Sequence, residues 1–198
     1  AEAPQWLVLA TARGQIKRTQ LAEYAHARQA PLAALRLDEG DRLVGVDAGE
    51  GDAEILLHTA LGKAIRFAAS DVRPTGRVAG GVRAIKLDSG DHVLSGSPLV
   101  RGPAVLTLTA TGVGRRTLIG EYPLQGRDGA GVKAFKLGDK TGSLVAVLSV
   151  DERSSIEGID GAGKAFILEA KEAPLQDRQR AGLVVAQGVA MAVLLPQR

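Results

Sequence analysis

The chain contains no cysteine, and aromatic residues make up only 3% of its 198 residues. Without cysteine it can form neither disulfides nor thiolate metal sites, which fits a reducing compartment. With so few aromatic rings, its core must consist mainly of Val, Leu, Ile and Ala. The three histidines, His26, His58 and His92, are scattered along the sequence, so we expect no metal site.

Long apolar segments and a strong net charge are also lacking. The longest apolar stretch, residues 183–196, is interrupted by Gln187 and is too short to span a bilayer. No secretory signal pattern opens the sequence, and we expect a cytoplasmic location. The formal net charge is +3, which by itself does not establish a nucleic-acid partner.

Glycine, by contrast, is abundant, and some of it recurs at a nearly fixed period. The segments TARGQIKRT, TALGKAIRF, TATGVGRRT and DGAGKAFIL contain Gly14, Gly62, Gly112 and Gly163, with spacings of 62−14=48, 112−62=50 and 163−112=51. Downstream, APLAALRL, GGVRAIKL, AGVKAFKL and AGLVVAQG recur on the same period. The sequence therefore predicts four repeats of one unit, at approximately 4–50, 51–101, 102–151 and 152–198, within a single domain spanning 1–198.

Each repeat is predicted to contain four short strands. Apolar runs such as EILLHT and KAIRFAA flank the turn glycine, which can adopt the positive φ that a tight hairpin requires. Two further strand-like segments follow, around VRAIKL and HVLSG in the second repeat. Four strands in a repeat of this length are typical of a propeller blade. The sequence lacks the recurring Trp-Asp and Gly-His pairs of WD40 repeats, and its sole tryptophan, Trp6, does not fit kelch repeats. We predict an all-β, propeller-like fold of about four blades.

The string GIDGAGKAF, residues 158–166, is one residue short of a phosphate-binding loop. Such a loop needs Ser or Thr after the lysine to hold Mg²⁺, and a helix must follow. Here Ala165 takes the hydroxyl position, and AFILEA has the pattern of a strand. We interpret the string as the hairpin turn of the fourth repeat.

Basic residues recur at fixed distances from the turn glycines. Cations stand three or four residues after the glycine in the first three repeats. In the last three repeats, an arginine follows the glycine at one constant spacing (77−62, 127−112 and 178−163). The first repeat has a shortened version of the second pattern, with Arg28 before Pro31. The candidate DNA-binding residues are Lys17, Arg18, Arg28, Lys63, Arg66, Arg73, Arg77, Arg83, Arg115, Arg116, Arg127, Lys133 and Arg178.

Cations at the same place in successive blades would form a belt along one rim. Such a belt suits a polyanion that bends, and its binding would depend on phosphate neutralisation rather than on base contacts. The scarcity of aromatic residues argues against a stacking platform for single strands. We therefore predict double-stranded DNA as the ligand; for any single cation, the alternative role is to keep the surface soluble.

The repeats resemble those of the C-terminal domain of the DNA gyrase A subunit over essentially the whole chain. The resemblance rests on GQIKRTQLAEYAHAR, GKAIRFAASDVRPTGRVAGGVRAIKLDSGD and GVGRRTLIGEYPLQGRDGAGVKAFKL. It implies a β-pinwheel that binds, bends and wraps duplex DNA and so supports ATP-dependent negative supercoiling by the holoenzyme. It implies no catalytic residue and no cofactor in this domain, with ATP and Mg²⁺ used elsewhere. The implied partners are DNA, the gyrase B subunit, and the remainder of the gyrase A subunit; the implied location is the nucleoid, with no membrane association.

Family members carry a box of the form Gln-basic-Arg-Gly-Gly-basic-Gly in their first blade. The nearest string in this chain lies in the third repeat and comprises Gln125, Gly126, Arg127, Asp128, Gly129, Ala130 and Gly131. It lacks both flanking cations and gains Asp128, so it is a degenerate box. Six blades are usual in gyrase, and the four predicted here suggest a fragment or a shortened variant.

Two alternatives remain open at this stage. The chain also resembles the C-terminal domain of the topoisomerase IV ParC subunit, whose blades are fewer or divergent and whose box is not intact. A propeller that binds proteins through its faces is the other alternative. An enzyme acting by itself has little support, because no Ser-His-Asp set is present. In the family, the DNA-cleaving tyrosine belongs to another domain, which argues against Tyr24 and Tyr122 as nucleophiles.

Overall fold

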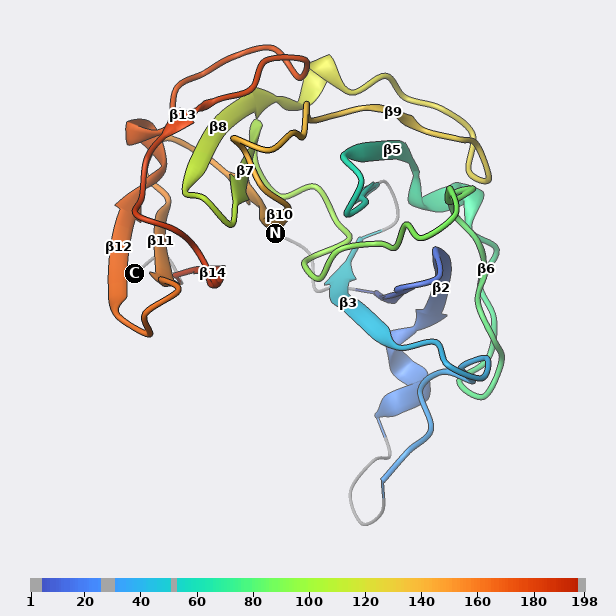
Figure 1. Ribbon diagram of the computed structural model, residues 1–198. Helices are drawn as coiled ribbons and strands as arrows, with labels where there is room; N and C mark the ends of the chain where they lie inside the picture. Colours follow the sequence, from blue (N-terminus) through green and yellow to red (C-terminus); the bar gives the residue numbers. More distant parts are fainter. Residues whose placement is uncertain (1–4, 26–30, 51–52, 196–198) are drawn as a thin grey trace. The chain divides into compact units, whose positions relative to one another are not determined.

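The computed structural model describes residues 5–25, 31–50 and 53–195. Within these residues the secondary structure consists of β-strands and short 3-10 turns (Figure 1). Arg28 lies outside the described residues. Short 3-10 turns follow the second strand of each hairpin, and no described helix is long and apolar enough to cross a membrane. The strands are β1 (Trp6–Thr11), β2 (Gln15–Gln20), β3 (Leu43–Gly49), β4 (Glu54–His58), β5 (Lys63–Ala68), β6 (Val82–Arg83), β7 (Ala104–Thr109), β8 (Val113–Leu118), β9 (Val132–Lys133), β10 (Leu144–Val150), β11 (Ser155–Ile159), β12 (Ala165–Glu169), β13 (Leu183–Val184) and β14 (Met191–Leu194).

The four glycine turns form hairpins, as predicted. The φ angles of Gly14, Gly62, Gly112 and Gly163 are 78°, 82°, 83° and 83°. These values lie in the left-handed region, where a side chain is strained and glycine is not. GIDGAGKAF is the turn between β11 and β12, and a strand rather than a helix follows its lysine, so the hairpin interpretation is confirmed.

The strands form four small antiparallel sheets, which confirms the all-β fold. Two sheets have the expected four strands, in the orders β3-β1-β2-β6 and β10-β7-β8-β13. The other two have three strands, in the orders β4-β5-β9 and β12-β11-β14. The repeat boundaries and the single-domain organisation stay predictions.

Neighbouring repeats exchange short strands. β6 pairs with β2, β9 with β5 and β13 with β8, so each hairpin of the first three repeats gains its outer strand from the following repeat (Figure 1). The register is the same each time. Ala84, Ala134 and Val185, which occupy equivalent places in their own repeats, each donate a backbone hydrogen bond to the turn glycine of the preceding repeat. The long loop of one repeat therefore covers the hairpin of the repeat before it.

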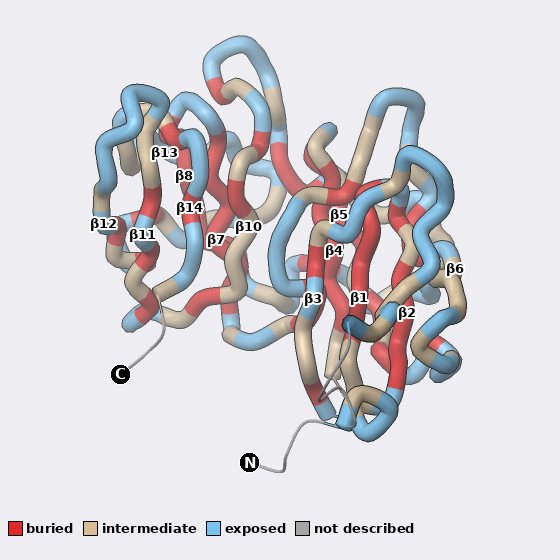
Figure 2. Tube along the Cα trace, turned by 90° about the horizontal axis from the view of Figure 1, so that it is seen from below, coloured by how far each residue is buried: buried red, intermediate tan, exposed pale blue. Residues whose placement is uncertain are grey.

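Two compact units are present, and each has its own core. The first comprises Ala1–Leu57, Ile65–Val100 and Leu124–Gly131, and its core contains buried aliphatic residues of β1, β2, β4 and β5. The second comprises His58–Ala64, Arg101–Pro123 and Val132–Arg198, and its core is built on β7, β10, β11 and β12. Burial is concentrated in the strands, and the connecting turns are largely exposed (Figure 2).

Candidate nucleic-acid interface

The cations three residues after the turn glycine are buried, contrary to their predicted place on an exposed rim. Lys17 and Arg115 are only 1% and 0% exposed. The ammonium group of Lys17 donates hydrogen bonds to the carbonyl oxygens of Ala34, at 2.8 Å, and Arg77. Burial lowers the pKa of both cations. They cannot reach a phosphate without leaving the interior.

Arg115 repeats the arrangement of Lys17 with more donors. Its guanidinium donates to the carbonyl oxygens of Ala134, Arg178, at 2.6 Å, and Arg180. It also lies 4.4 Å from the centre of the Phe135 ring, a cation–π contact. In both repeats the buried cation joins the segment after the long loop of its own repeat to the arginine-bearing loop of the next. Its role is structural.

The cations one residue further on are also engaged with protein groups. Arg18, 8% exposed, lies 4.5 Å from the centre of the Trp6 ring. Arg66 forms an ion pair with Glu54 at 2.6 Å. Arg116, 9% exposed, donates to the carbonyl oxygen of Ala173 at 2.9 Å. The predicted belt of hairpin cations is therefore wrong in its placement: these side chains pack inside or against the sheets.

Two arginines of the long loops, Arg127 and Arg178, connect successive repeats. Arg127 donates to the carbonyl oxygens of Asp71 and Arg83, both at 3.1 Å. Arg178 donates to those of Glu121, at 3.0 Å, and Lys133, which stand at the same two positions of its preceding repeat. The arginine that recurs at a constant spacing after the turn glycine therefore has a structural role in connecting repeats. Arg127 is exposed, whereas Arg77 and Arg178 are half-buried.

An exposed set of cations lies on the segments GVRAIKL and GVKAFKL. Arg83 and Lys86 flank the buried pair Ala84 and Ile85, and Lys133 and Lys136 flank a second buried pair in the same way. Lys86 and Lys136 were missed from the sequence, although their identical place in two repeats was a visible signal. We call Arg83, Lys86, Lys133 and Lys136 the paired cations. Arg73 is also exposed, and Lys63 is half-buried.

Like charges face each other at one of these segments. Lys63 of β5 is directly opposite Lys133 of β9 in the sheet.

The degenerate box forms the loop that covers the second hairpin. Gln125 donates its backbone N–H to the carbonyl oxygen of Arg66 at 2.8 Å. Gly126 is exposed, and Gly131 has a φ of 70°. Asp128 forms an ion pair with Arg83. Of the box side chains, only Arg127 is cationic, and its guanidinium is turned toward main-chain oxygens.

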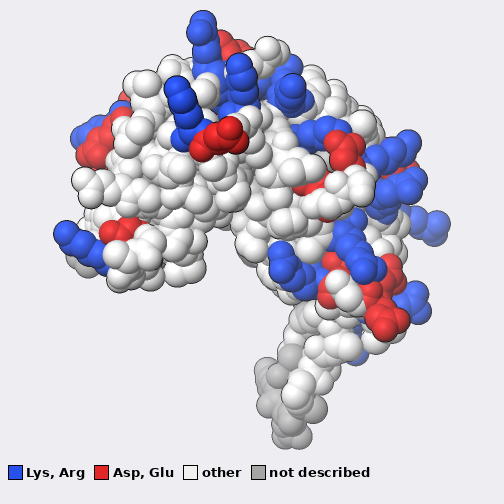
Figure 3. Space-filling model, viewed as in Figure 1, with Lys and Arg blue, Asp and Glu red and all other residues white. Residues whose placement is uncertain are grey.

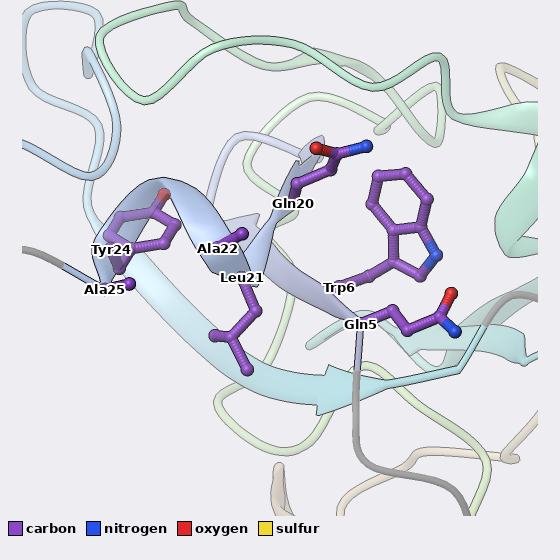
Figure 4. A pocket seen from close by; sticks show the side chains of 7 residues that line it. All are labelled: Gln5, Trp6, Gln20, Leu21, Ala22, Tyr24 and Ala25. Carbon is purple, nitrogen blue, oxygen red and sulfur yellow. The ribbon is translucent and has the colours of Figure 1, made fainter.

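A separate pocket of about 650 Å³ lies in the first unit (Figure 4). It is lined by Gln5, Trp6, Gln20, Leu21, Ala22, Tyr24 and Ala25. None of these lining side chains is cationic. Charged side chains gather over parts of each unit in Figure 3, where acidic groups lie among the basic ones. Among the described residues, no His, Cys, Asp and Glu side chains group as a metal site would require.

The family model described as "DNA gyrase C-terminal domain, beta-propeller" matches residues 5–48, 53–99 and 104–151. The DNA gyrase A subunit of Klebsiella oxytoca is 47% identical over 77 residues, which are 39% of this chain and 9% of that protein. The DNA gyrase A subunit of Escherichia coli K12 is 44% identical over 77 residues, with the same two shares, 39% and 9%. The matches thus span less than a tenth of these relatives.

Solved structures show the same fold. The C-terminal domain of DNA topoisomerase IV superposes with a TM-score of 0.88 at 23% identity, over 98% of this chain and 62% of that one. The DNA gyrase A C-terminal domain gives 0.85 at 24% identity, over 98% and 67%. Because the family model covers more than half of the sequence, the chain belongs to the DNA gyrase C-terminal domain family.

Proposed function

We propose that this chain binds, bends and wraps duplex DNA as a non-catalytic module of a type IIA topoisomerase. The observation that carries the proposal is the recurrence of the paired cations: two exposed cations flank a buried dipeptide at the same offsets in two consecutive repeats.

The parent protein that we propose is the gyrase A subunit. The curated relatives that match this chain at 42–47% identity bear that name. In this proposal the module works on nucleoid DNA, together with the gyrase B subunit and the remainder of its own chain. ATP and Mg²⁺ are used by other parts of the holoenzyme, which then introduces negative supercoils.

Binding of a linear duplex as a function of salt and length tests the proposal. Phosphate neutralisation predicts that log K falls linearly with log salt, with a slope of about −0.9 for each phosphate contacted. Wrapping predicts that a duplex of ~10 bp binds weakly and a longer one more tightly, because bending spreads its cost over many contacts. Salt-independent binding of a protein, with no affinity for duplex, would instead favour the protein-interaction alternative.

The topoisomerase IV ParC subunit is a second candidate parent, favoured by the TM-score of 0.88 with that enzyme's C-terminal domain. The two parents differ in what the holoenzyme does to relaxed plasmid with ATP. Negative supercoiling supports gyrase. Relaxation or decatenation without negative supercoiling would assign the chain to topoisomerase IV.

A further inference from the structure

Asp128 has an unusual backbone conformation for its residue type. Its φ is 68°, and among the described residues no other non-glycine residue has a positive φ. Its carboxylate accepts two hydrogen bonds from the guanidinium of Arg83, one of them 3.0 Å long. The ion pair lies at the surface, where the Arg83 side chain is 59% exposed.

The backbone around Asp128 is fixed to the segment that carries two of the paired cations. The Asp128 N–H donates to the carbonyl oxygen of Ala84 at 2.6 Å, and the Lys86 N–H donates to that of Gly129 at 2.8 Å. Arg127 donates to the carbonyl oxygen of Arg83 at 3.1 Å. The carboxylate contacts the guanidinium of Arg83. The charges of Arg83, Lys86 and Arg127 all lower its pKa, Arg83 most through its hydrogen bond.

The loop takes this form because the second repeat lacks the buried cation. In the first and third repeats, Lys17 and Arg115 donate to the carbonyl oxygens of Ala34 and Ala134. In the second repeat the corresponding carbonyl belongs to Ala84, and Ile65 has no side-chain donor. The Asp128 N–H supplies the missing hydrogen bond, and this places the carboxylate beside Arg83.

We propose that Arg83, Lys86 and Arg127 form a binding site for a DNA backbone phosphate, and that the carboxylate of Asp128 occupies this site until DNA displaces it. The inference rests on the proposed function and adds its regulation: Asp128 weakens DNA binding at this repeat. Carboxylate and phosphate oxygens accept the same hydrogen bonds from a guanidinium, so one can replace the other. Exposed ion pairs are weak and screened by salt, so the exchange is accessible.

The test compares Asp128→Asn with Glu157→Gln in duplex binding. Both substitutions remove one negative charge without changing size, and Asn also tolerates a positive φ. Glu157 is exposed on β11, in the repeat that lacks the paired cations. We expect Asp128→Asn to tighten binding about three- to tenfold at low salt and to steepen the salt slope by less than the value of about 0.9 for one phosphate, because DNA contacts the site in both chains. Glu157→Gln should leave the slope unchanged.

Arg83→Ala identifies the group that Asp128 restrains. In the Asp128→Asn background, Arg83→Ala should abolish both the tighter duplex binding and the steeper salt slope. In the chain that keeps Asp128, Arg83→Ala should change duplex affinity less. Equal behaviour of Asp128→Asn and Glu157→Gln, or a gain that survives Arg83→Ala, would overturn the inference while DNA binding itself stands. If the unchanged chain has no affinity for duplex, the proposed function fails first, and the inference fails with it. Asp128→Gly provides the same readout if the asparagine variant is poorly folded.

Inorganic phosphate at constant ionic strength separates free phosphate from DNA as the ligand. A site that recognises a phosphate within a duplex should show no competition beyond that of chloride. Specific displacement of DNA by millimolar phosphate, lost in Arg83→Ala, would assign the site to the free anion and refute the DNA assignment.

Discussion

At the scale of single residues, whether a cationic side chain is buried or exposed depends on the main-chain carbonyl groups around it. Arg115 is enclosed by main-chain oxygens and a phenyl ring, whereas Lys136, in the same unit, is exposed. Burying a cation is tolerated only where hydrogen bonds replace its water. A cation's recurrence in the sequence therefore does not say whether it faces solvent.

Arg115→Met should destabilise the protein by about 3 kcal/mol or more, because several buried carbonyl groups would lose their charged donor. Lys136→Met should change stability by no more than about 0.5 kcal/mol, as expected for an exposed site. Chemical denaturation of both variants measures the difference. DNA affinity should respond in the opposite order, with folded Arg115→Met binding normally and Lys136→Met binding less tightly. Equal stability of the two variants would contradict the structural role of Arg115.

His58 should make stability depend on pH. Burial, together with the nearby charge of Arg115, lowers its pKa to about 3, and its ring lies 5.2 Å from that of Tyr122. Its Nε2 atom has no hydrogen-bond partner within the described part of the chain. Between the unfolded pKa of about 6.5 and the folded value, the unfolded chain binds a proton that the folded one does not. The free energy of unfolding should therefore decrease as pH falls through this window, by up to about 1.4 kcal/mol per pH unit.

His58→Leu is the control for this pH dependence, because the third repeat has Leu108 at the same position. Urea unfolding between pH 4 and 7 should give a flatter profile for the variant than for the unchanged chain. An unaltered profile would show that other groups cause the pH dependence.

At the scale of elements, the hairpins could be predicted, but the pairing of the exchanged strands with the preceding repeat could not. Apolar runs on either side of Gly62 or Gly112 contain all the information that a local turn needs. β6 and β9 lie in segments that the sequence marks as strand-like, but they are only two residues long and pair with hairpins of the preceding repeat, which no local pattern indicates. The exchanged strands pair with the edge of the hairpins of the first three repeats. Consecutive residues of β2 and of β8 are buried, so an alternating pattern could not show which side chains face solvent.

The same exchange explains why equivalent turn glycines should differ in sensitivity. A Cβ at Gly112 would overlap the carbonyl group of Ala186, whereas a Cβ at Gly163 would meet nothing within 4 Å. Both residues have a φ of 83°, so the backbone strain of alanine is the same. Gly163→Ala should cost about 1 kcal/mol, the strain alone. Gly112→Ala should cost a further amount of about 2 kcal/mol, because the segment that follows β13 must move. Thermal unfolding of the two variants measures this difference, and equal melting temperatures would count against the strand exchange.

At the scale of the whole molecule, the four repeats have diverged in charge more than in backbone. The fourth repeat keeps the hairpin and its exchanged strand, yet it has Val184 and Gln187 where the second has Arg83 and Lys86. The family model likewise matches segments of the first three repeats. The sequence predicted the family, the fold class and a basic recurrence. It did not distinguish cations that hold repeats together from cations exposed to solvent, since that depends on contacts between residues far apart in the chain, such as Arg115 and Arg178.

This division of the cations leads to a prediction for the entire chain. Replacing all four paired cations by glutamine should weaken duplex binding alike for every DNA sequence, because phosphates rather than bases are contacted. If each contacts one phosphate, the magnitude of the salt slope should fall by roughly 3.6, at about 0.9 per contact. The matched control replaces four exposed cations of the fourth repeat by glutamine, which removes the same charge: Arg153, Lys164, Lys171 and Arg180. Fluorescence anisotropy with labelled duplex at several salt concentrations measures both slopes. The control variant should lose much less duplex affinity and salt slope, since its side chains contribute only to the overall electrostatic potential of the protein. Equal losses in the two variants would mean that net charge, and not the paired cations, determines DNA binding.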